Sequence, residues 1–341
     1  MNRVGRRSHR GPYAPARMGL TTARVVDTHT EGMPTRVVLA GVDRPTGTTV
    51  AEVADAFAAA HDDLRGALVC EPRGHAAMYA AFVLPPLDPA NHALVLYAEA
   101  AGFLPGCGHA TIGVATTLVN EGLVEVTEPE TVVRVETRSG LVEARVAVTS
   151  GRATHVAVRM VPSFVLRSGL ELDGGLTVDV CWGGNFYAVA PLGAVVPGLR
   201  VDPANARALI AAGMDVMART DAACEVVHPE RPDVRGCKHA MLTDGDRSAV
   251  VIYTGVLDRS PCGTGTSARL ALLHATGALA TDEWFEHRSV LDTRFRARVV
   301  GTTSVAGIPA VLPEIVGRAW ITGRAELVLD PTDPFPRGFR L

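Results

Sequence analysis

Cys107-Gly-His-Ala-Thr111 and Cys262-Gly-Thr-Gly-Thr266 each open an amphipathic stretch of the sequence. Each stretch meets a glycine fifteen residues after its cysteine, Gly122 in the first case and Gly277 in the second. A glycine at that place is typical of the left-handed residue that ends a helix. The pattern therefore predicts two helices that begin just after a cysteine and end just before a glycine.

The segments around the two helices also correspond. An apolar, strand-like run precedes each cysteine, at Ala93–Tyr97 and at Ala249–Tyr253. Gly32 and Gly184 precede their cysteines by 75 and 78 positions. Alternating patterns typical of β-strands follow the helices, at residues 131–137, 141–148, 289–300 and 318–329. A repeat of about 155 residues is too long for a solenoid, so we expect a duplicated α/β (α+β) fold, with two domains of like topology related by a pseudo-twofold axis.

Length and composition limit the class of protein. The chain has 341 residues, of which 47% are hydrophobic and 20% charged, and its net charge is −3. This length suggests two domains, and the charge gives no electrostatic case for binding nucleic acid or an acidic membrane. No apolar run approaches the roughly 20 residues that a membrane helix needs. We therefore expect a soluble, cytoplasmic protein with neither a nucleic-acid nor a membrane partner.

The N-terminal residues 1–20 are rich in arginine and hold no acidic residue and no apolar secretory segment. We expect a disordered tail there, or a start at Met18, with a transit-like segment as the alternative. Without export, the six cysteines lie in a reducing compartment, where a set of disulfides is not expected. Their spacing also lacks the close pairs of zinc sites, so each cysteine has to be considered alone.

A cysteine beside glycine at the start of a helix lies where free backbone N–H groups and the helix dipole concentrate positive potential. Such a place predicts a lowered cysteine pKa, and the same N–H groups can bind a carboxylate. Two such sites, at Cys107 and Cys262, predict a carboxylate held between two helix starts, with a thiol on each face of the adjoining carbon. This arrangement suits inversion of an amino-acid Cα, in which one thiolate removes a proton and the opposite thiol delivers another.

The cysteines also have simpler interpretations. A buried cysteine is usually a small hydrophobic residue, and we expect this of the other four, Cys70, Cys181, Cys224 and Cys237. A disulfide between Cys107 and Cys262 is disfavoured by a reducing compartment, although their closeness would let oxidation inactivate the protein.

The two cysteines belong to motifs that resemble the proline racemase family, which includes proline racemases, 4-hydroxyproline 2-epimerases and trans-3-hydroxyproline dehydratases. The resemblance extends from about residue 22 to residue 341, and the chain's end, Asp330-Pro-Thr-Asp-Pro-Phe335, resembles the family's ending. Its other motifs are Asp27-Thr-His-Thr-Glu-Gly-Met-Pro-Thr-Arg36, Glu71-Pro-Arg-Gly-His75, Gly106-Cys-Gly-His-Ala-Thr-Ile-Gly113, Gly184-Asn-Phe-Tyr187 and Asp258-Arg-Ser-Pro-Cys-Gly-Thr-Gly-Thr266.

The resemblance implies a diaminopimelate-epimerase-like fold of two mirrored domains, each with a curved sheet around a central helix. The active site would lie in the cleft between them, with no cofactor, neither pyridoxal phosphate nor a metal. The first domain would span residues 21–166, with about 321–341 returning to it, and the second residues 167–320. The family also suggests a homodimer and a small-molecule substrate, proline or hydroxyproline.

Carried over residue by residue, the resemblance implies roles for a set of site residues. Cys107 and Cys262 are the catalytic pair. The backbone N–H groups that bind the substrate carboxylate belong to Gly108, His109, Gly263 and Thr264. Asp258 and the His109 side chain contact the ring nitrogen. The alternatives are that Asp258 only forms a turn before Pro261 and that His109 only caps its helix.

Several positions bear on which family member this is. The dehydratases carry threonine in place of the second cysteine, so Cys262 disfavours dehydration. Gly106 and Ala110 replace the methionine and glycine that the family usually carries there, and these positions border the pocket. The run that starts at Cys262 resembles the hydroxyproline epimerases, whose ring hydroxyl needs a polar partner. His239 is either that partner or a solvent-exposed loop histidine.

We therefore predict a 4-hydroxyproline 2-epimerase, which converts trans-4-hydroxy-L-proline to cis-4-hydroxy-D-proline, with proline racemase as the alternative. A non-catalytic amino-acid-binding protein on the same fold would have no need of both thiols, and a redox sensor would need the two thiols to bridge reversibly. Tyr79, Phe186 and Tyr187 either line the ring-binding side of the pocket or belong to the core.

Overall fold

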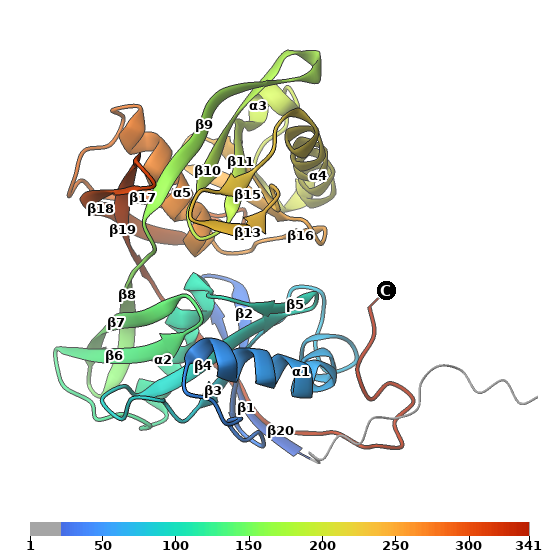
Figure 1. Cartoon of the computed structure of the whole chain (residues 1–341), viewed down its shortest axis with the longest axis vertical. Coiled ribbons are helices and arrows are strands. Elements are labelled where there is room, and N and C mark those ends of the chain that lie inside the picture. The colour runs from blue at the N-terminus through green and yellow to red at the C-terminus, as the bar shows by residue number, and fades with distance from the viewer. Residues whose placement is uncertain (1–21, 341) are drawn as a thin grey trace, which may run out of the picture.

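Two helices of equal length, α2 (Gly108–Asn120) and α5 (Gly263–Ala275), lie one in each lobe of the molecule (Figure 1). This computed structural model describes residues 22–340, so the expected tail at 1–20 and the alternative start at Met18 lie outside the described residues. Gly122 and Gly277 follow the helix ends with φ of 66° and 73°, as the sequence predicted.

The first lobe is a curved sheet around α2, with α1 (Val50–Val69) outside it (Figure 1). A capping box of Thr49 and Glu52 begins α1. The strands pair in the order β20–β1–β2–β3–β4–β6–β7–β8, parallel at β2–β3 and β4–β6 and otherwise antiparallel. Their bounds are β1 (Thr22–Thr30), β2 (Met33–Ala40), β3 (Tyr79–Leu84), β4 (Ala93–Glu99), β6 (Glu130–Thr137), β7 (Gly140–Thr149), β8 (Arg152–Arg159) and β20 (Ala319–Val328), and the short β5 (Gly102–Leu104) pairs with β4.

The second lobe repeats this order around α5. Its strands pair as a closed ring, β9–β10–β11–β14–β15–β17–β18–β19–β9, parallel at β11–β14 and β15–β17 and otherwise antiparallel. The bounds are β9 (Ser163–Leu172), β10 (Leu176–Trp182), β11 (Phe186–Pro191), β14 (His239–Asp244), β15 (Arg247–Ile252), β17 (Phe285–Arg288), β18 (Arg294–Val305) and β19 (Ile308–Gly317). The smaller elements are α3 (Leu192–Val195), α4 (Ala206–Ala223), β16 (Val256–Leu257) and the hairpin of β12 (Val227–His228) and β13 (Arg231–Arg235). The matching order of parallel and antiparallel pairs confirms the predicted pseudo-symmetric α/β fold.

The two lobes exchange strands. β9 follows β8 of the first lobe but pairs with β10 of the second, whereas β20 follows β19 of the second lobe but pairs with β1 of the first. The chain therefore crosses between the lobes twice, once between β8 and β9 and once between β19 and β20. After each crossing, the next strand joins the sheet of the lobe that the chain enters. The domain boundaries at 166 and 320 stay a prediction.

One of the predicted strand segments was wrong at its start. Residues 289–293 form a turn, and the strand begins only at Arg294, in β18. The hairpin partner of β18 is β19, which the pattern missed, because Pro309 and Pro313 interrupt its alternation and proline is unfavourable within a sheet. The predicted strand at 318–329 is confirmed as β20, and it pairs with β1 of the first lobe.

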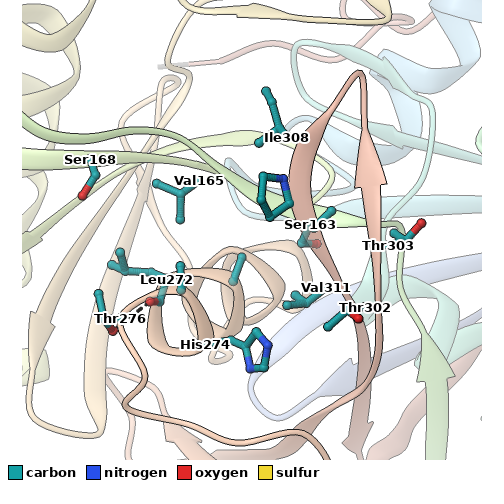
Figure 2. A pocket seen from close by; sticks show the side chains of 14 residues that line it. Ser163, Val165, Ser168, Leu272, His274, Thr276, Thr302, Thr303, Ile308 and Val311 are labelled. Carbon is teal, nitrogen blue, oxygen red and sulfur yellow. Dashed lines mark hydrogen bonds between the residues drawn. The ribbon is translucent and has the colours of Figure 1, made fainter.

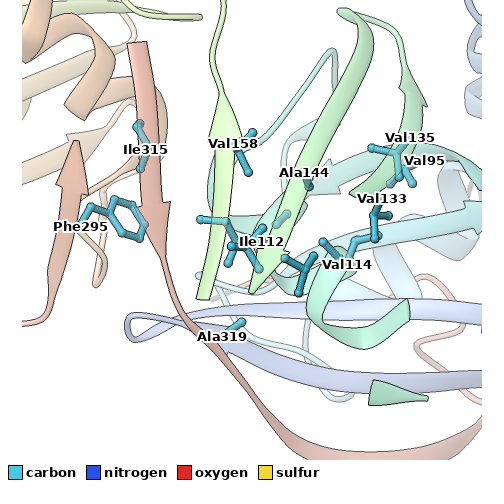
Figure 3. Close-up of a cluster of buried hydrophobic side chains, with 14 of the residues drawn as sticks. Val95, Ile112, Val114, Val133, Val135, Ala144, Val158, Phe295, Ile315 and Ala319 are labelled. Atoms are coloured by element: carbon cyan, nitrogen blue, oxygen red, sulfur yellow. The ribbon is translucent and has the colours of Figure 1, made fainter. Parts of the chain in front are cut away.

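Aliphatic side chains of α2 form the core of the first lobe. Figure 3 shows Ile112 and Val114 of this helix among valines of the surrounding strands, including Val133 and Val158. Phe295 of β18 and its neighbours on β19 join the same cluster. Full burial of such a side chain contributes roughly 1.5–3 kcal/mol to the stability of the fold. The buried apolar face of α2 therefore holds the helix in place, and with it the first residue of the helix.

Candidate active site

The starts of α2 and α5 approach each other at the boundary between the lobes. A Cβ atom built on Gly108 would lie 3.2 Å from the Cα atom of Gly263, and one built on Gly263 would lie 3.1 Å from the Cα atom of Gly108. A side chain at either position would press the two helix starts apart, so both glycines are needed for this approach. The free N–H groups of two helices are thereby brought to one place.

A cavity of about 610 Å³ lies at this place, and residues of both lobes line it. This volume and a mixed polar and apolar lining are typical of small-molecule sites. The structure brings all of the predicted site residues together in this lining: Cys107, Gly108, His109, His239, Asp258, Cys262, Gly263 and Thr264.

Cys107 is the N-cap residue of α2, and its side chain makes no capping hydrogen bond. Its Sγ atom lies 3.3 Å from Nδ1 of His109, whose ring is buried. The carbonyl of Cys107 accepts hydrogen bonds from the backbone N–H and the hydroxyl of Thr111, and the Tyr97 hydroxyl lies 2.7 Å from that hydroxyl. Cys107 is thus held by the first helical turn, which leaves its thiol free to face the cavity.

Cys262 is the N-cap residue of α5 and has an unusual backbone, with φ of 69° and ψ of 116°. A non-glycine residue with such a φ is strained by about 1–3 kcal/mol, and such residues gather at functional sites. Thr266 holds the Cys262 carbonyl as Thr111 holds that of Cys107, with its hydroxyl 2.7 Å away. The Sγ atom of Cys262 lies 3.3 Å from Oη of Tyr187.

Burial controls the ionisation of both thiols. Loss of hydration raises the pKa of Cys107 to about 12, although backbone N–H groups of Ala110 and His109 act in the opposite direction. Burial, together with the Asp258 carboxylate, also raises the pKa of Cys262. The lowered pKa predicted from the sequence is therefore wrong for the protein without substrate, because a helix start can be recognised in a sequence whereas the depth of burial cannot.

Asp258 forms a turn and also lines the cavity. Its Oδ1 atom accepts hydrogen bonds from the backbone N–H and the hydroxyl of Ser260, both at 2.9 Å, so it does form the turn before Pro261. It also lines the cavity, and burial raises its pKa. The His109 side chain contacts the Cys107 thiol instead of capping α2, and burial lowers its pKa to about 3, which keeps the imidazole neutral.

His239 lies at the start of β14 in the cavity wall and not in an exposed loop. Its ring packs on that of Tyr187, with 4.8 Å between centroids, and burial lowers its pKa to about 4. Its Nδ1 atom is buried and has no hydrogen-bond partner among the described residues. An unpaired buried polar atom in a cavity wall is a candidate contact for a polar ligand group.

The sequence did not decide whether three aromatic residues line the pocket or belong to the core, and the structure places them in the site. Tyr79, Phe186 and Tyr187 line the cavity, and the Tyr79 ring packs edge-on against His109. The contact between Tyr187 and the Cys262 thiol was not predicted, because the two residues are 75 positions apart in the sequence. The Gly184-Asn-Phe-Tyr187 motif was the feature that could have pointed to it.

A second cavity, of about 560 Å³, lies in the second lobe beside α5 (Figure 2). Aliphatic and hydroxyl side chains such as Val165, Leu272 and Thr303 line it. His274 is the only ionisable residue among those of the described chain that line it, and the Nδ1 atom of His274 already lies 3.0 Å from the Leu279 carbonyl. The first cavity is therefore the candidate active site.

A buried histidine lies directly behind α5. His287 has no exposed surface, its Nε2 atom lies 2.6 Å from the Ser248 hydroxyl, and its Nδ1 atom lies 2.8 Å from the Thr266 hydroxyl that binds the Cys262 carbonyl. Burial lowers the pKa of His287 to about 3. The helix that presents Cys262 therefore depends on an imidazole that stays neutral.

This histidine predicts a loss of stability in mild acid. The unfolded chain binds a proton at a histidine pKa of about 6.5, whereas folded His287 does not until about pH 3, so its stabilising contribution is full above pH 6.5 and falls as the pH decreases. Between pH 7 and pH 5.5 we expect His287 to lower the free energy of unfolding by about 1 kcal/mol. Urea unfolding at both pH values measures this, with His287→Gln as the comparison. Equal changes in the two proteins would contradict the prediction.

Within residues 22–340, no group of three or more histidine, cysteine, aspartate or glutamate side chains is placed to hold a metal ion. Within the same residues, no helix has the length and apolar character needed to cross a membrane.

Known proteins match this chain over nearly its whole length. The 4-hydroxyproline 2-epimerase of Streptosporangium roseum is 48% identical over 328 residues, which cover 93% of this chain and 97% of that protein. A crystal structure of a hydroxyproline epimerase from Agrobacterium vitis with bound trans-4-hydroxy-L-proline is 36% identical, with a TM-score of 0.84 and coverage of 94% and 96%. A crystal structure of a probable proline racemase from Agrobacterium radiobacter with bound carbonate is 38% identical, with a TM-score of 0.85 and the same coverage.

The family model described as proline racemase matches residues 25–340. This range holds both helix starts, both cysteines and every residue of the candidate site that the sequence predicted. The chain belongs to the proline racemase family.

Proposed function

We propose that the protein is a 4-hydroxyproline 2-epimerase that inverts Cα of trans-4-hydroxy-L-proline and gives cis-4-hydroxy-D-proline. The observation that carries the proposal is a single cavity in which two cysteines lie at the starts of two facing helices. The relatives support the substrate, because the S. roseum protein is named for this reaction and the A. vitis structure holds trans-4-hydroxy-L-proline.

The substrate carboxylate would lie between the helix starts. The backbone N–H groups of Gly108, His109, Gly263 and Thr264 belong to the first turns of α2 and α5 and have no partner within the helices. As the α-proton leaves, negative charge moves into the carboxylate, and fixed donors stabilise that charge without having to reorganise. This stabilisation matters because the α-proton of an amino acid is a very weak acid.

Proton transfer would use the thiols as a pair. A thiolate on one face takes the α-proton, so an S–H bond forms while the Cα–H bond breaks and its electron pair moves toward the carboxylate carbon. The thiol on the other face then gives its proton to Cα, and its own S–H bond breaks. The pair ends with thiol and thiolate exchanged, and the configuration of Cα is inverted.

The raised thiol pKa values imply that a substrate charge helps to form the thiolate. Cys107 and Cys262 are both protonated at neutral pH in the protein without substrate. The ring nitrogen of the substrate carries a positive charge, and an opposite charge within about 4–6 Å favours an ionised thiol. Asp258 and His109, in the same cavity, are the side chains that we propose for contact with this nitrogen.

His239 is the proposed partner of the ring hydroxyl, because its Nδ1 atom is buried without a partner among residues 22–340. Replacement by phenylalanine keeps an aromatic ring against Tyr187 but removes this polar atom. We expect His239→Phe to lower kcat/KM for trans-4-hydroxy-L-proline about 10- to 100-fold, and to change kcat/KM for L-proline much less. Steady-state kinetics with both substrates measures the ratio, and an equal loss for both would contradict this role.

Proline racemase is the second candidate function, because a similar solved structure is described as a probable proline racemase and the chemistry at Cα would be the same. Dehydration of trans-3-hydroxyproline is disfavoured because Cys262 occupies the second catalytic position. A binding protein or a redox sensor on this fold would not need two thiols together with a carboxylate site. A homodimer and a cytoplasmic location stay predictions.

The proposal is tested by incubating the reduced protein with trans-4-hydroxy-L-proline and, separately, with L-proline, and following both by chiral chromatography. We expect cis-4-hydroxy-D-proline to form with the higher kcat/KM. A higher kcat/KM for formation of D-proline would favour the racemase instead. Inversion of neither substrate by protein that binds them would overturn the proposed function.

A further inference from the structure

Three polar side chains connect the Gly184-Asn-Phe-Tyr187 motif to the sulfur of Cys262. The Asn185 Nδ2 atom lies 3.4 Å from Oγ1 of Thr264, and that Oγ1 atom lies 2.6 Å from Oη of Tyr187. The same Oη atom lies 3.3 Å from Sγ of Cys262. Tyr187 has no exposed surface, and its hydroxyl contacts Thr264 and Cys262.

The chemistry of the three groups limits the direction of this chain. An amide nitrogen can only donate, so Oγ1 of Thr264 accepts from Asn185. The Thr264 hydroxyl has one hydrogen, and either this hydrogen or that of Tyr187 lies in their short contact. When Thr264 is the donor, the single hydrogen of the Tyr187 hydroxyl is directed at the sulfur of Cys262.

We infer that Asn185, Thr264 and Tyr187 form a chain of hydrogen-bond donors that ends on Cys262 and stabilises its thiolate. The catalytic consequence rests on the proposed function, because it supplies a reason for Cys262 to ionise within the pair. The donor chain itself belongs to the protein without substrate. Tyr187 thereby lowers the pKa of Cys262, against the larger effect of burial.

Among residues 22–340, no matching chain of side chains reaches Cys107 in the first lobe. By the matching strand order of the two lobes, β2 and β3 correspond to β11 and β14. Thr35 of β2 pairs with Tyr79 of β3. In the same way, Tyr187 of β11 pairs with His239 of β14. Thr35 therefore occupies the place of Tyr187, and its hydroxyl has no hydrogen-bond partner among the described residues. Cys107 has the neutral imidazole of His109 as its neighbour instead. The two thiols of the pair are thus supported by different groups.

The test is the rate at which iodoacetamide alkylates each cysteine of the whole protein without substrate, resolved by mass spectrometry across a range of pH. We expect Tyr187→Phe to slow alkylation of Cys262 about tenfold at a fixed pH and to move its pH profile about one unit upward, because a hydrogen bond to a charged group is lost. Alkylation of Cys107 in the same sample should not change. Tyr97→Phe, which removes a buried hydroxyl behind Cys107, should leave the rate at Cys262 as it is in the natural protein.

Variants of Thr264 test the direction of the chain. Thr264→Val removes the hydroxyl that donates to Tyr187 and that itself lies 3.8 Å from Sγ of Cys262, so alkylation of Cys262 should slow, and Thr264→Ser should restore it. If Tyr187 instead donated to Thr264, the valine variant would free its hydrogen for the sulfur and alkylation would become faster, which would overturn the inference. An unchanged Cys262 profile in Tyr187→Phe would also overturn it. Because no substrate is used, protein that inverts no hydroxyproline but shows these effects would contradict only the proposed function.

Discussion

Replacing Cys262 by serine is expected to lower kcat/KM for trans-4-hydroxy-L-proline about 1000-fold or more. Proton transfer by a positioned side chain contributes about 10²- to 10⁴-fold, and a serine hydroxyl is a much weaker acid than a thiol. The cavity offers no other thiol on that face, since Cys107 and Cys262 are the two cysteines of the described chain that line it. Cys107→Ser should cause a loss of similar size, because inversion needs both a base and an acid.

Cys224→Ser is the matched control for these variants. Cys224 is a free cysteine at the end of α4 and does not line the cavity, so its replacement should leave kcat/KM unchanged. The measurement is steady-state kinetics on reduced protein, with circular dichroism to verify the fold. A Cys262→Ser protein that is folded and keeps more than about a tenth of the activity would contradict the two-thiol account, because general acid–base groups contribute at least about 100-fold.

Gly183→Ala is expected to lower the free energy of unfolding by about 2–3 kcal/mol and kcat/KM about 100-fold. A Cβ atom on Gly183 would lie 2.1 Å from the carbonyl oxygen of Thr264 and 2.5 Å from the backbone nitrogen of Ala268. Both atoms belong to the backbone of α5, so the helix as a whole would have to move. A displacement of about 1 Å at its start would misplace Cys262 and the N–H groups that we propose for the carboxylate.

Gly193→Ala separates this effect from a general effect of glycine replacement. Gly193 lies in the short helix α3, and a Cβ atom there would meet no atom within 4 Å. Its replacement should be neutral or slightly stabilising, since alanine loses less conformational entropy than glycine on folding. Urea unfolding of both variants gives the comparison. Equal stability of the two variants would show that α5 can move away from β10 and β11 at no cost, contrary to this account.

The sequence predicted the parts of the fold that depend on local rules. The two helices begin just after Cys107 and Cys262 and end before Gly122 and Gly277, as predicted, because helix starts and left-handed glycine caps are set by neighbouring residues. The duplication was also visible, since the same spacing recurs after about 155 residues. The exchange of β9 and β20 between the lobes was only partly foreseen, because strand pairing over such separations depends on the whole fold.

In the candidate site, too, the sequence predicted what depends on local motifs and missed what depends on the folded structure. Motifs brought Cys107, Cys262 and Asp258 into the prediction, and one cavity contains all three. The ionisation of the thiols was predicted in the wrong direction, because burial is a property of the closed cavity and not of the Cys-Gly dipeptide. The Tyr187 contact was missed since it joins two residues that are 75 positions apart in the sequence.

The two halves share a strand order but differ in the chemistry around their cysteines. Thr111 and Thr266 bind the carbonyls of the two cysteines in the same way, yet the group behind Thr111 is Tyr97 and the group behind Thr266 is His287. The proposed substrate carries its ring on one side of Cα, so it does not share the pseudo-twofold symmetry of the two lobes. Differences of this kind are therefore expected in a site that treats the two faces of one carbon in turn.

The most direct test of the two-thiol account is proton NMR of trans-4-hydroxy-L-proline incubated with the reduced protein in D₂O, followed at early conversion. Because the proton delivered to the product comes from the opposite thiol, which has exchanged with solvent, we predict cis-4-hydroxy-D-proline that carries deuterium at Cα. The remaining substrate should keep its α-proton. A product that retains the original α-proton, or substrate that exchanges its α-proton before any inversion, would mean that a single base works on both faces and would contradict the account.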